Sequence, residues 1–281
     1  FILIGLSFLI LYPIFVTVMI SLMQTSDFTN SAVRYLSLSP TLENYKTAAI
    51  FLQYWQTLLR SLALNIPLCL LEIVSCMLVA YGFARFKFKG NGILFGCVIM
   101  TLLIPSSIYF TPFYLSLQDY GPFHWNLLGT PLPLFLMSVC ALGVKNGLVI
   151  YILRQHFKAY PKELEEAAEI DGAGSFRVFV SIMLPGAMSI AATCFLFIFV
   201  FRWTDPTHTN IFLPDTEFIW TRLSKIQTDM SLLPGVEQSD FYFRSILKNT
   251  SIVLYAIPLV VLFIFTKRSL VESVETSGLV G

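Results

Sequence analysis

The chain has 281 residues, of which 56% are hydrophobic and only 12% are charged, with a formal net charge of +1 at pH 7. Soluble domains contain roughly 25% charged residues, and the mean hydropathy here is +0.74. This composition excludes an ordinary soluble enzyme, and it predicts a single all-α integral membrane domain over residues 1–281. The balanced charge gives no sign of a nucleic-acid partner, and we expect none.

Six apolar segments are long enough to cross a bilayer, which takes about 20 residues. Because these runs are continuous rather than alternating, they predict helices and not barrel strands. The first run is too long for a signal-peptide core, so we expect it to span the membrane. The chain starts at Phe1 rather than Met, and we expect its natural N-terminus to be missing. The predicted spans are about 2–23, 62–83, 93–117, 132–153, 181–201 and 246–265.

Lys and Arg are unevenly distributed between the predicted loops. The loop after the second span contains Arg85, Lys87 and Lys89, whereas the loop after the third span contains neither residue type. Basic loops face the cytoplasm. The pattern therefore predicts that both termini are cytoplasmic, including a tail over about 267–281.

The predicted outer segment over about 203–244 is long for a simple turn. Composition alone leaves two interpretations open, a surface for a partner or a solvated connector. Its acidic residues are Asp205, Asp215, Glu217, Asp229, Glu237 and Asp240.

Motifs for catalysis, cofactors and metals are missing from the sequence. No G-x4-G-K-[ST] phosphate loop occurs, so we expect no ATP hydrolysis by this chain. The three histidines are far apart, which argues against a metal site or a catalytic triad. The five cysteines lie in apolar segments without paired spacing, and we expect buried, unpaired thiols.

Two opposite charges lie near the middle of predicted spans, Glu72 in the second and Lys145 in the fourth. A charge at this depth is costly and faces the protein interior or water. We expect Glu72 and Lys145 to pair or to line an aqueous pathway, with Asn146 as a further candidate.

A conspicuously polar run separates the fourth and fifth spans. Pro161 and Glu163 favour a helix start and Gly172 favours its end, which predicts a short helix over about 161–172. Helical spacing places Leu164, Ala167, Ala168 and Asp171 on one side, Glu166 on the flank, and Glu165 and Glu169 toward water. Membrane-surface helices carry bulky apolar residues and Lys or Arg instead. The pattern therefore predicts a surface that docks on another protein.

The same run resembles a known motif. Glu166, Ala167, Ala168, three residues, Gly172, nine residues, Ile182, one residue, Leu184 and Pro185 match the EAA motif of the membrane subunits of binding-protein-dependent ABC importers. "YGFARFKFKG" at 81–90 and "KRSLVESVETSGLVG" at the end are similar to the carbohydrate-uptake, MalG-like branch. The outer loop opens with Trp-Thr-Asp and the tail closes on Val-Gly, where that branch usually has a Trp-Asn-Asp-like sequence and Lys-Gly.

The resemblance implies a permease subunit that forms half of a pathway for a sugar or oligosaccharide, in a bacterial or archaeal cell membrane. Its implied protein partners are a second permease that is homologous to it, two ATPase subunits that bind ATP and Mg, and an external solute-binding protein that contacts the outer loop. Membrane lipid surrounds the spans. The short helix would be the coupling helix. Its implied ATPase-docking residues are Glu166, Ala167, Ala168, Asp171 and Gly172, with Gly281 in the tail.

Two other functions remain open at this point. An ion-coupled secondary transporter would use Glu72 and Lys145 as coupling sites. A structural or regulatory membrane subunit would need neither. The docking motif favours the importer, because an ion-coupled carrier needs no surface for an ATPase.

Overall fold

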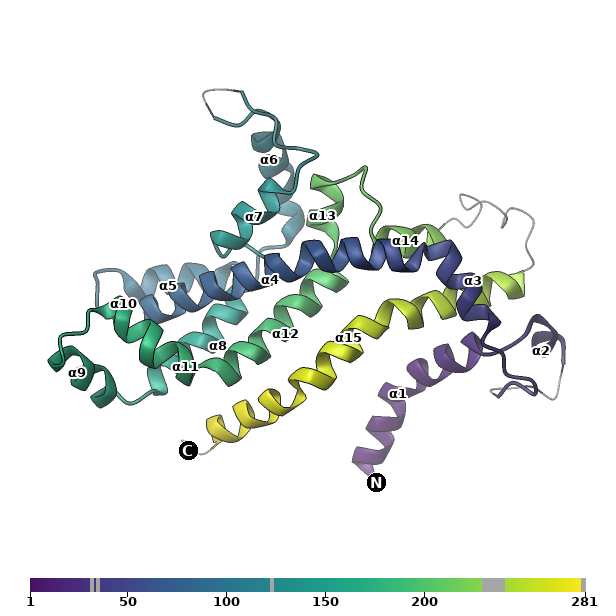
Figure 1. Ribbon diagram of the computed structural model, residues 1–281, viewed down its shortest axis with the longest axis horizontal. Coiled ribbons are helices and arrows are strands. Elements are labelled where there is room, and N and C mark those ends of the chain that lie inside the picture. The colour runs from purple at the N-terminus through teal and green to yellow at the C-terminus, as the bar shows by residue number, and fades with distance from the viewer. Residues whose placement is uncertain (31–32, 34–35, 122–123, 229–240, 279–281) are drawn as a thin grey trace. The chain divides into compact units, whose positions relative to one another are not determined.

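The computed structural model describes residues 1–30, 33, 36–121, 124–228 and 241–278 (Figure 1). Every regular element in these residues is helical, which confirms the predicted all-α class. The elements are α1 (Ile2–Ser21), α2 (Thr25–Thr29), α3 (Glu43–Leu52), α4 (Tyr54–Arg85), α5 (Asn91–Met100), α6 (Ser106–Gln118), α7 (Leu132–Val139), α8 (Asn146–Ala159), α9 (Glu163–Ile170), α10 (Ser175–Val178), the π-helical turn η1 (Phe179–Met183), α11 (Leu184–Gly186), α12 (Met188–Thr204), α13 (Thr207–Phe212), α14 (Ile219–Thr228) and α15 (Phe241–Gly278).

Within the described residues, three helices are long and apolar enough to cross a membrane: α1, α4 and α15. They correspond to the first, second and sixth predicted spans. Helix α4 begins at Tyr54 rather than near Leu62, because Gln56 and Arg60 interrupt the apolar pattern without interrupting the helix. Helix α15 continues to Gly278, so the described part of the predicted tail is helical.

The other predicted spans are divided. The third is split between α5 and α6, and the fourth between α7 and α8. The fifth is a pair, Ser175–Gly186 and Met188–Thr204, bent by 79°. In the described residues, length and composition support three spans, or four if the bent pair is one. The count of six therefore stays a prediction.

The chain divides into two compact units, Phe1–Ala63 with Glu217–Val261, and Leu64–Thr216 with Leu262–Gly281. In the first unit, polar contacts fasten the end of α1. The Asn44 side chain donates to the carbonyl groups of Ser21 and Met23, both at 2.8 Å. The Ser21 hydroxyl lies 2.7 Å from the Tyr45 hydroxyl. The first part of α1, up to residue 15, is exposed and mostly apolar. This surface is suited to lipid or to another membrane helix.

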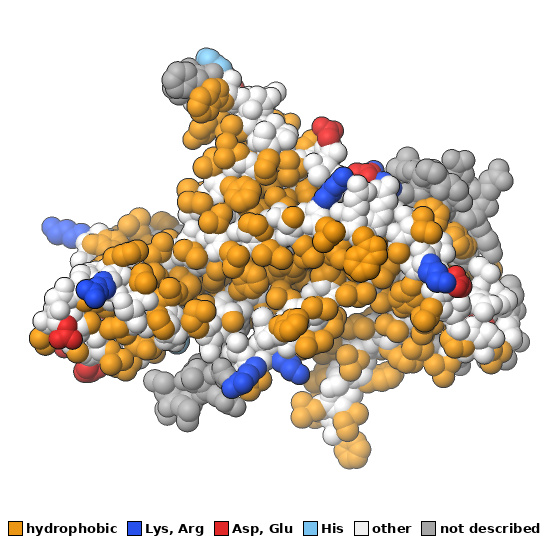
Figure 2. Space-filling view, viewed as in Figure 1, with side chains coloured by type: hydrophobic (Ala, Val, Ile, Leu, Met, Phe, Trp, Pro, Cys, Tyr) orange, Lys and Arg blue, Asp and Glu red, His pale blue; other side chains and the backbone are white. Residues whose placement is uncertain are grey.

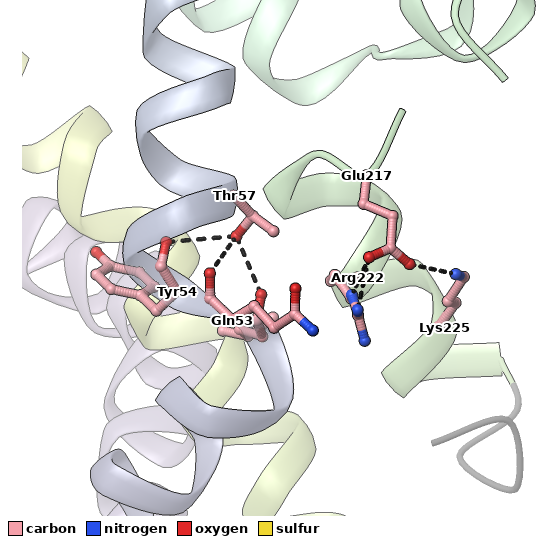
Figure 3. Close-up of polar contacts among 7 residues, drawn as sticks. Gln53, Tyr54, Thr57, Glu217, Arg222 and Lys225 are labelled. Atoms are coloured by element: carbon pink, nitrogen blue, oxygen red, sulfur yellow. Dashed lines mark hydrogen bonds and ion pairs between the residues drawn. The ribbon is translucent and has the colours of Figure 1, made fainter. Parts of the chain in front are cut away.

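Helix α14 packs an apolar face, Ile219, Trp220, Leu223 and Ile226, into the first unit. Ahead of it, Glu217 accepts hydrogen bonds from Arg222 and from Lys225 at 2.9 Å (Figure 3). The described part of the predicted outer loop thus includes α13 and α14 as well as the first residues of α15. Its residues 229–240 lie outside the described part, and Asp229, Glu237 and Asp240 are among them.

The core of the second unit is formed where α8 and α12 pack together, with the neighbouring part of α4. Cys69, Cys76 and Cys194 are buried in it as expected. Cys97 and Cys140 are exposed on the chain, so the expectation of burial was wrong for these two; all five thiols are free. Hydrophobic side chains predominate on the visible surface over α4 and α5 (Figure 2), as expected of helices that meet lipid or other membrane subunits.

Candidate functional site

Helix α9 is the predicted docking helix, and it lies next to α10 in Figure 1. Glu163, Glu165 and Glu166 occupy its first turn, where negative charge is favoured by the helix dipole. It ends at Ile170, and Gly172, just beyond its C-cap, has a φ of +81°, a left-handed conformation that glycine adopts readily. The N–H groups of Gly172 and Ala173 close the end by donating to Glu169 and Ala168. The predicted stop at Gly172 is therefore present.

The back of α9 is held against the end of α4. Arg85 Nε lies 3.2 Å from Glu165 Oε1, and the two side chains are only 7% and 14% exposed. Arg85 also donates from Nη2 to the carbonyl of Tyr160 at 2.7 Å, just before α9. Glu165 therefore faces protein and not water, contrary to the sequence-based expectation. The reason is that Arg85 reaches it from a helix far away in sequence.

Tyr81, one turn before Arg85, completes this contact. Its hydroxyl lies beside the Glu165 carboxylate. Its ring packs on Phe179 and Phe157, with ring centres 5.0 and 5.8 Å away. Burial raises the pKa of the Glu165 carboxyl group, and the positive charge of Arg85 offsets this only in part. Arg85, Glu165 and Tyr81, here called the α4–α9 clamp, thus join the two helices.

The front of α9 is open. Glu166, Ala167, Asp171 and Gly172 are exposed, and Ala168 is half-buried. Bulky apolar residues surround them: Leu164 is 46% exposed, Ile170 is 86% exposed, and Phe176 on α10 is 74% exposed. Ile170 and Phe176 are absent from the docking residues predicted from the sequence, although two bulky apolar residues in a polar loop are a usable signal. Gly281, the remaining predicted docking residue, lies outside the described residues.

A groove of about 550 Å³ runs beside the clamp. Arg154 is fixed in its wall, 3.8 Å from the Phe95 ring centre, and donates to the Phe83 carbonyl. The groove combines basic and acidic side chains at the predicted cytoplasmic end of the spans. Its charged lining is Arg85, Lys87, Arg154, Lys158, Lys162, Glu165, Glu166 and Glu169.

The buried carboxylate Glu72 pairs with Arg202 on α12, not with Lys145. Arg202 Nε lies 2.5 Å from Glu72 Oε2, and the side chains are 7% and 0% exposed. Arg202 Nη2 also donates to Ser138 Oγ at 2.7 Å. The predicted Glu72–Lys145 pair is thus not formed. The sequence does not indicate Arg202 as the partner, because Arg202 falls just past the predicted end of the fifth span.

Gly143 makes room for this ion pair. A Cβ atom at Gly143 would lie 1.8 Å from Glu72 Oε1, closer than any real contact. Lys145 is exposed, and its ammonium group lies 4.8 Å above the centre of the Phe201 ring. Asn146 is 4% exposed, and its side chain lies beside the Glu72 carboxylate. The structure therefore brings Glu72 and Asn146 together and leaves Lys145 at the surface.

Comparison with known proteins agrees with this architecture. A probable ABC transporter permease protein of Pyrococcus horikoshii is 28% identical over 244 residues, which cover 86% of this chain and 80% of the relative. The maltodextrin transport system permease protein MdxG of Bacillus subtilis is 26% identical, over 98% of this chain and 93% of the relative. A crystal structure of a bacterial ABC transporter involved in the import of the acidic polysaccharide alginate has a similar fold, with a TM-score of 0.71 over 95% of this chain and 93% of that chain, at 19% identity.

A family model decides the assignment. The model described as "Binding-protein-dependent transport system inner membrane component" matches residues 73–268, well over half of the chain. That range includes the α4–α9 clamp and the Glu72 partner Arg202, but not the first unit's α1. The chain therefore belongs to the family of inner membrane components of binding-protein-dependent transport systems, and it is a non-catalytic permease subunit of an ABC importer.

Proposed function

We propose that this chain forms half of the translocation pathway of an ATP-driven importer, and that α9 couples it to the ATPase subunit that binds ATP and Mg. The observation that carries the proposal is the two-sided character of α9. Its front, with Glu166, Ala167 and Ile170, is open to a partner, while its back is clamped to α4 through Arg85 and Glu165. A displacement of the docked helix would thereby move a membrane-spanning helix.

A sugar or oligosaccharide is the proposed solute. Relatives named for maltodextrin and for α-glucoside transport support this class. We further propose a homologous second permease as the partner across the pathway, an external solute-binding protein that contacts the segment after α12, and cytoplasmic positions for both termini. In this arrangement the tail with Gly281 also reaches the ATPase subunits.

Co-purification with the ATPase subunit tests the docking role. Glu166→Lys reverses an exposed charge on the front of α9, and Gly172→Pro forces a φ near −65° where the backbone has +81°. Both variants are expected to lose bound ATPase subunit while the second permease stays bound. Asp215→Lys is the matched control, an exposed carboxylate outside α9 that should leave the complex intact. Retention of the ATPase subunit by both α9 variants, or uptake without ATP in vesicles, would refute the proposal.

The two other functions considered from the sequence are disfavoured. The family assignment argues against an ion-coupled secondary transporter. Glu72 is also occupied by Arg202, which leaves it poorly placed to bind and release a coupling ion. A purely structural or regulatory subunit does not account for a docking helix clamped to a spanning helix.

A further inference from the structure

The fourth predicted span is interrupted at residues 140–145, between α7 and α8. Ala141 and Lys145 have left-handed φ angles of 55° and 58°, which side-chain-bearing residues seldom adopt. Broken backbone at membrane depth is tolerated where it lines a water-filled cavity or is covered by protein, and not where it meets lipid. The interruption therefore marks a side of the second unit that faces a pathway or a partner.

A cavity of about 470 Å³ opens at this interruption. Its volume lies within the range of roughly 300–1,000 Å³ that is typical of small-molecule sites. Most of its wall is apolar, including Phe113 and Ile150, and polar groups come from Thr101, Lys145 and Asn146. An apolar wall with few polar groups suits a sugar, whose ring has an apolar face.

The charge of the cavity is positive. Among the described residues, no carboxylate lies within ion-pair distance of Lys145, and Glu72 is neutralised by Arg202. Because an exposed ammonium group at this depth cannot face lipid without a large cost, it points to water or to a solute. The start of α8, whose first turn has no side-chain cap, adds the positive end of the helix dipole at the same place.

Asn146 is an independent sign of a missing ligand. It lines the cavity and is 4% exposed. Its side chain lies near Glu72, yet neither its amide nitrogen nor its amide oxygen makes a regular hydrogen bond in the described structure. Buried amide groups are normally satisfied. Both amide atoms are covered in this arrangement, so a rotation of the side chain toward the cavity would bring them to a solute group.

We propose that this cavity is a solute-contact site of the subunit and that it takes a negatively charged group, a carboxylate or a phosphate, carried by a sugar. Lys145 supplies the counter-charge, the start of α8 and Asn146 supply donors, and the apolar wall with Phe113 receives the ring. This rests on the proposed transport function and specifies the chemistry of its solute.

Cys140 makes the cavity accessible to measurement, since it lines the cavity and its thiol is exposed. The assembled transporter, in lipid nanodiscs without ATP, is treated with an anionic reagent (sulfonatoethyl methanethiosulfonate) or a cationic one (trimethylammonioethyl methanethiosulfonate). The Cys140 peptide is quantified by mass spectrometry in a Cys97→Ser background, which removes the other exposed thiol. The ratio of the anionic to the cationic rate then reports the local potential.

Lys145→Gln is expected to lower this ratio by about tenfold or more, because one charge a few ångströms away acts in opposite directions on the two reagents. Lys158→Gln is the matched control, on the same helix α8 but about 20 Å away by the helical rise, where salt screens the charge. It should leave the ratio unchanged. An unreactive Cys140, a ratio without anionic preference, or equal effects of the two variants would overturn the proposal.

A competition experiment identifies the negatively charged group that the cavity takes. Trigalacturonate, glucose 6-phosphate and neutral maltotriose are added at equal concentrations before labelling. The proposal is supported if either acidic sugar slows the labelling of Cys140, maltotriose does not, and this protection disappears in Lys145→Gln. The two acidic sugars distinguish a carboxylate from a phosphate. Equal protection by maltotriose, or no protection by any of the three, contradicts it. ATPase release by Glu166→Lys is a separate readout, so failure of the coupling proposal would be seen independently.

Discussion

Arg85 at the end of α4 and Glu165 on α9 form a nearly buried ion pair 3.2 Å apart. They join a membrane-spanning helix to the exposed helix at which an ATPase is proposed to act. Because burial raises the pKa of Glu165, its charged form depends on Arg85. The pair is therefore a mechanical link whose removal should affect coupling as well as stability.

Arg85→Met is expected to lower the stability of the chain by about 2 kcal/mol, since it leaves a buried carboxylate without its partner. Transport-stimulated ATP hydrolysis should also decrease in this variant. Adding Glu165→Gln to the same chain should recover part of the stability, because the unpaired charge is then removed, but should not restore coupling. Thermal unfolding and ATPase stimulation in nanodiscs measure the two effects.

Lys87→Met is the control for this link, at an exposed cation two residues after Arg85, just beyond the end of α4. It should change stability by less than about 0.5 kcal/mol. If the Arg85 and Lys87 variants behaved alike, the clamp would have no special role.

The ion pair of Glu72 and Arg202 makes a second prediction. Glu72→Leu should cost about 3–5 kcal/mol, because the buried Arg202 guanidinium loses its counter-charge. Adding Arg202→Met should recover much of this. The changes in the free energy of unfolding caused by Glu72→Leu and by Lys145→Gln, in contrast, should add to within about 0.5 kcal/mol. Unfolding of the detergent-solubilised chain measures both couplings, and strong coupling between Glu72 and Lys145 would contradict the structure.

Continuous apolar runs were enough to predict α1, α4 and α15, and these helices continue through Pro13, Pro67 and Pro258. The interruption between α7 and α8 could not be predicted in the same way. The apolar pattern continues through residues 140–145, and the helix breaks where Gly143 has to admit the Glu72 carboxylate. That requirement comes from a contact between segments far apart in sequence.

Helix α9 likewise combines features that local sequence predicts with one that depends on a residue far away in sequence. Its position before Gly172 follows from local residues, whose preferences act within a few positions, but the helix, Glu163–Ile170, is shorter than the predicted 161–172. The direction of Glu165 does not follow from local residues, because Leu164 and two alanines define no strong apolar face, and Arg85 decides which side is covered. The partner of Glu72 was missed for a related reason: similar depth in the membrane does not specify which helices are neighbours.

His208 on α13 predicts a pH dependence. It is 5% exposed, and burial lowers its pKa to about 4, with nearby Asp205 and Arg202 acting in opposite directions. The unfolded chain takes up this proton near pH 6.5, whereas the folded chain resists it until about pH 4. Stability is therefore fully present above pH 6.5 and decreases as the pH falls from 6.5 toward 4, by at most about 3 kcal/mol.

Melting temperatures between pH 8 and pH 4.5 test this dependence. His208→Gln should flatten the decrease below pH 6.5, whatever it does to stability at pH 8. His124→Gln, at a largely exposed histidine, should leave the decrease unchanged. Parallel curves for the wild type and His208→Gln would exclude His208 as its cause.

Two nearby glycines at the end of α9 provide a last prediction with an internal control. Gly172 has a φ of +81°, whereas Gly174 has a φ of −72°, and a Cβ atom at either position would meet nothing within 4 Å. Space therefore allows alanine at both, and only the backbone conformation differs. Gly172→Ala should cost about 1–2 kcal/mol and weaken ATPase binding, since the chain after α9 would leave its present course.

Gly174→Ala should be neutral or slightly stabilising, because alanine reduces the freedom of the unfolded chain. Thermal unfolding gives the stability difference, and titration of the ATPase subunit against nanodisc-embedded permease gives the binding difference. Equal behaviour of the two alanine variants would mean that the left-handed turn at Gly172 is not what positions the front of α9. A loss confined to Gly172→Ala would tie docking to the conformation of a single residue.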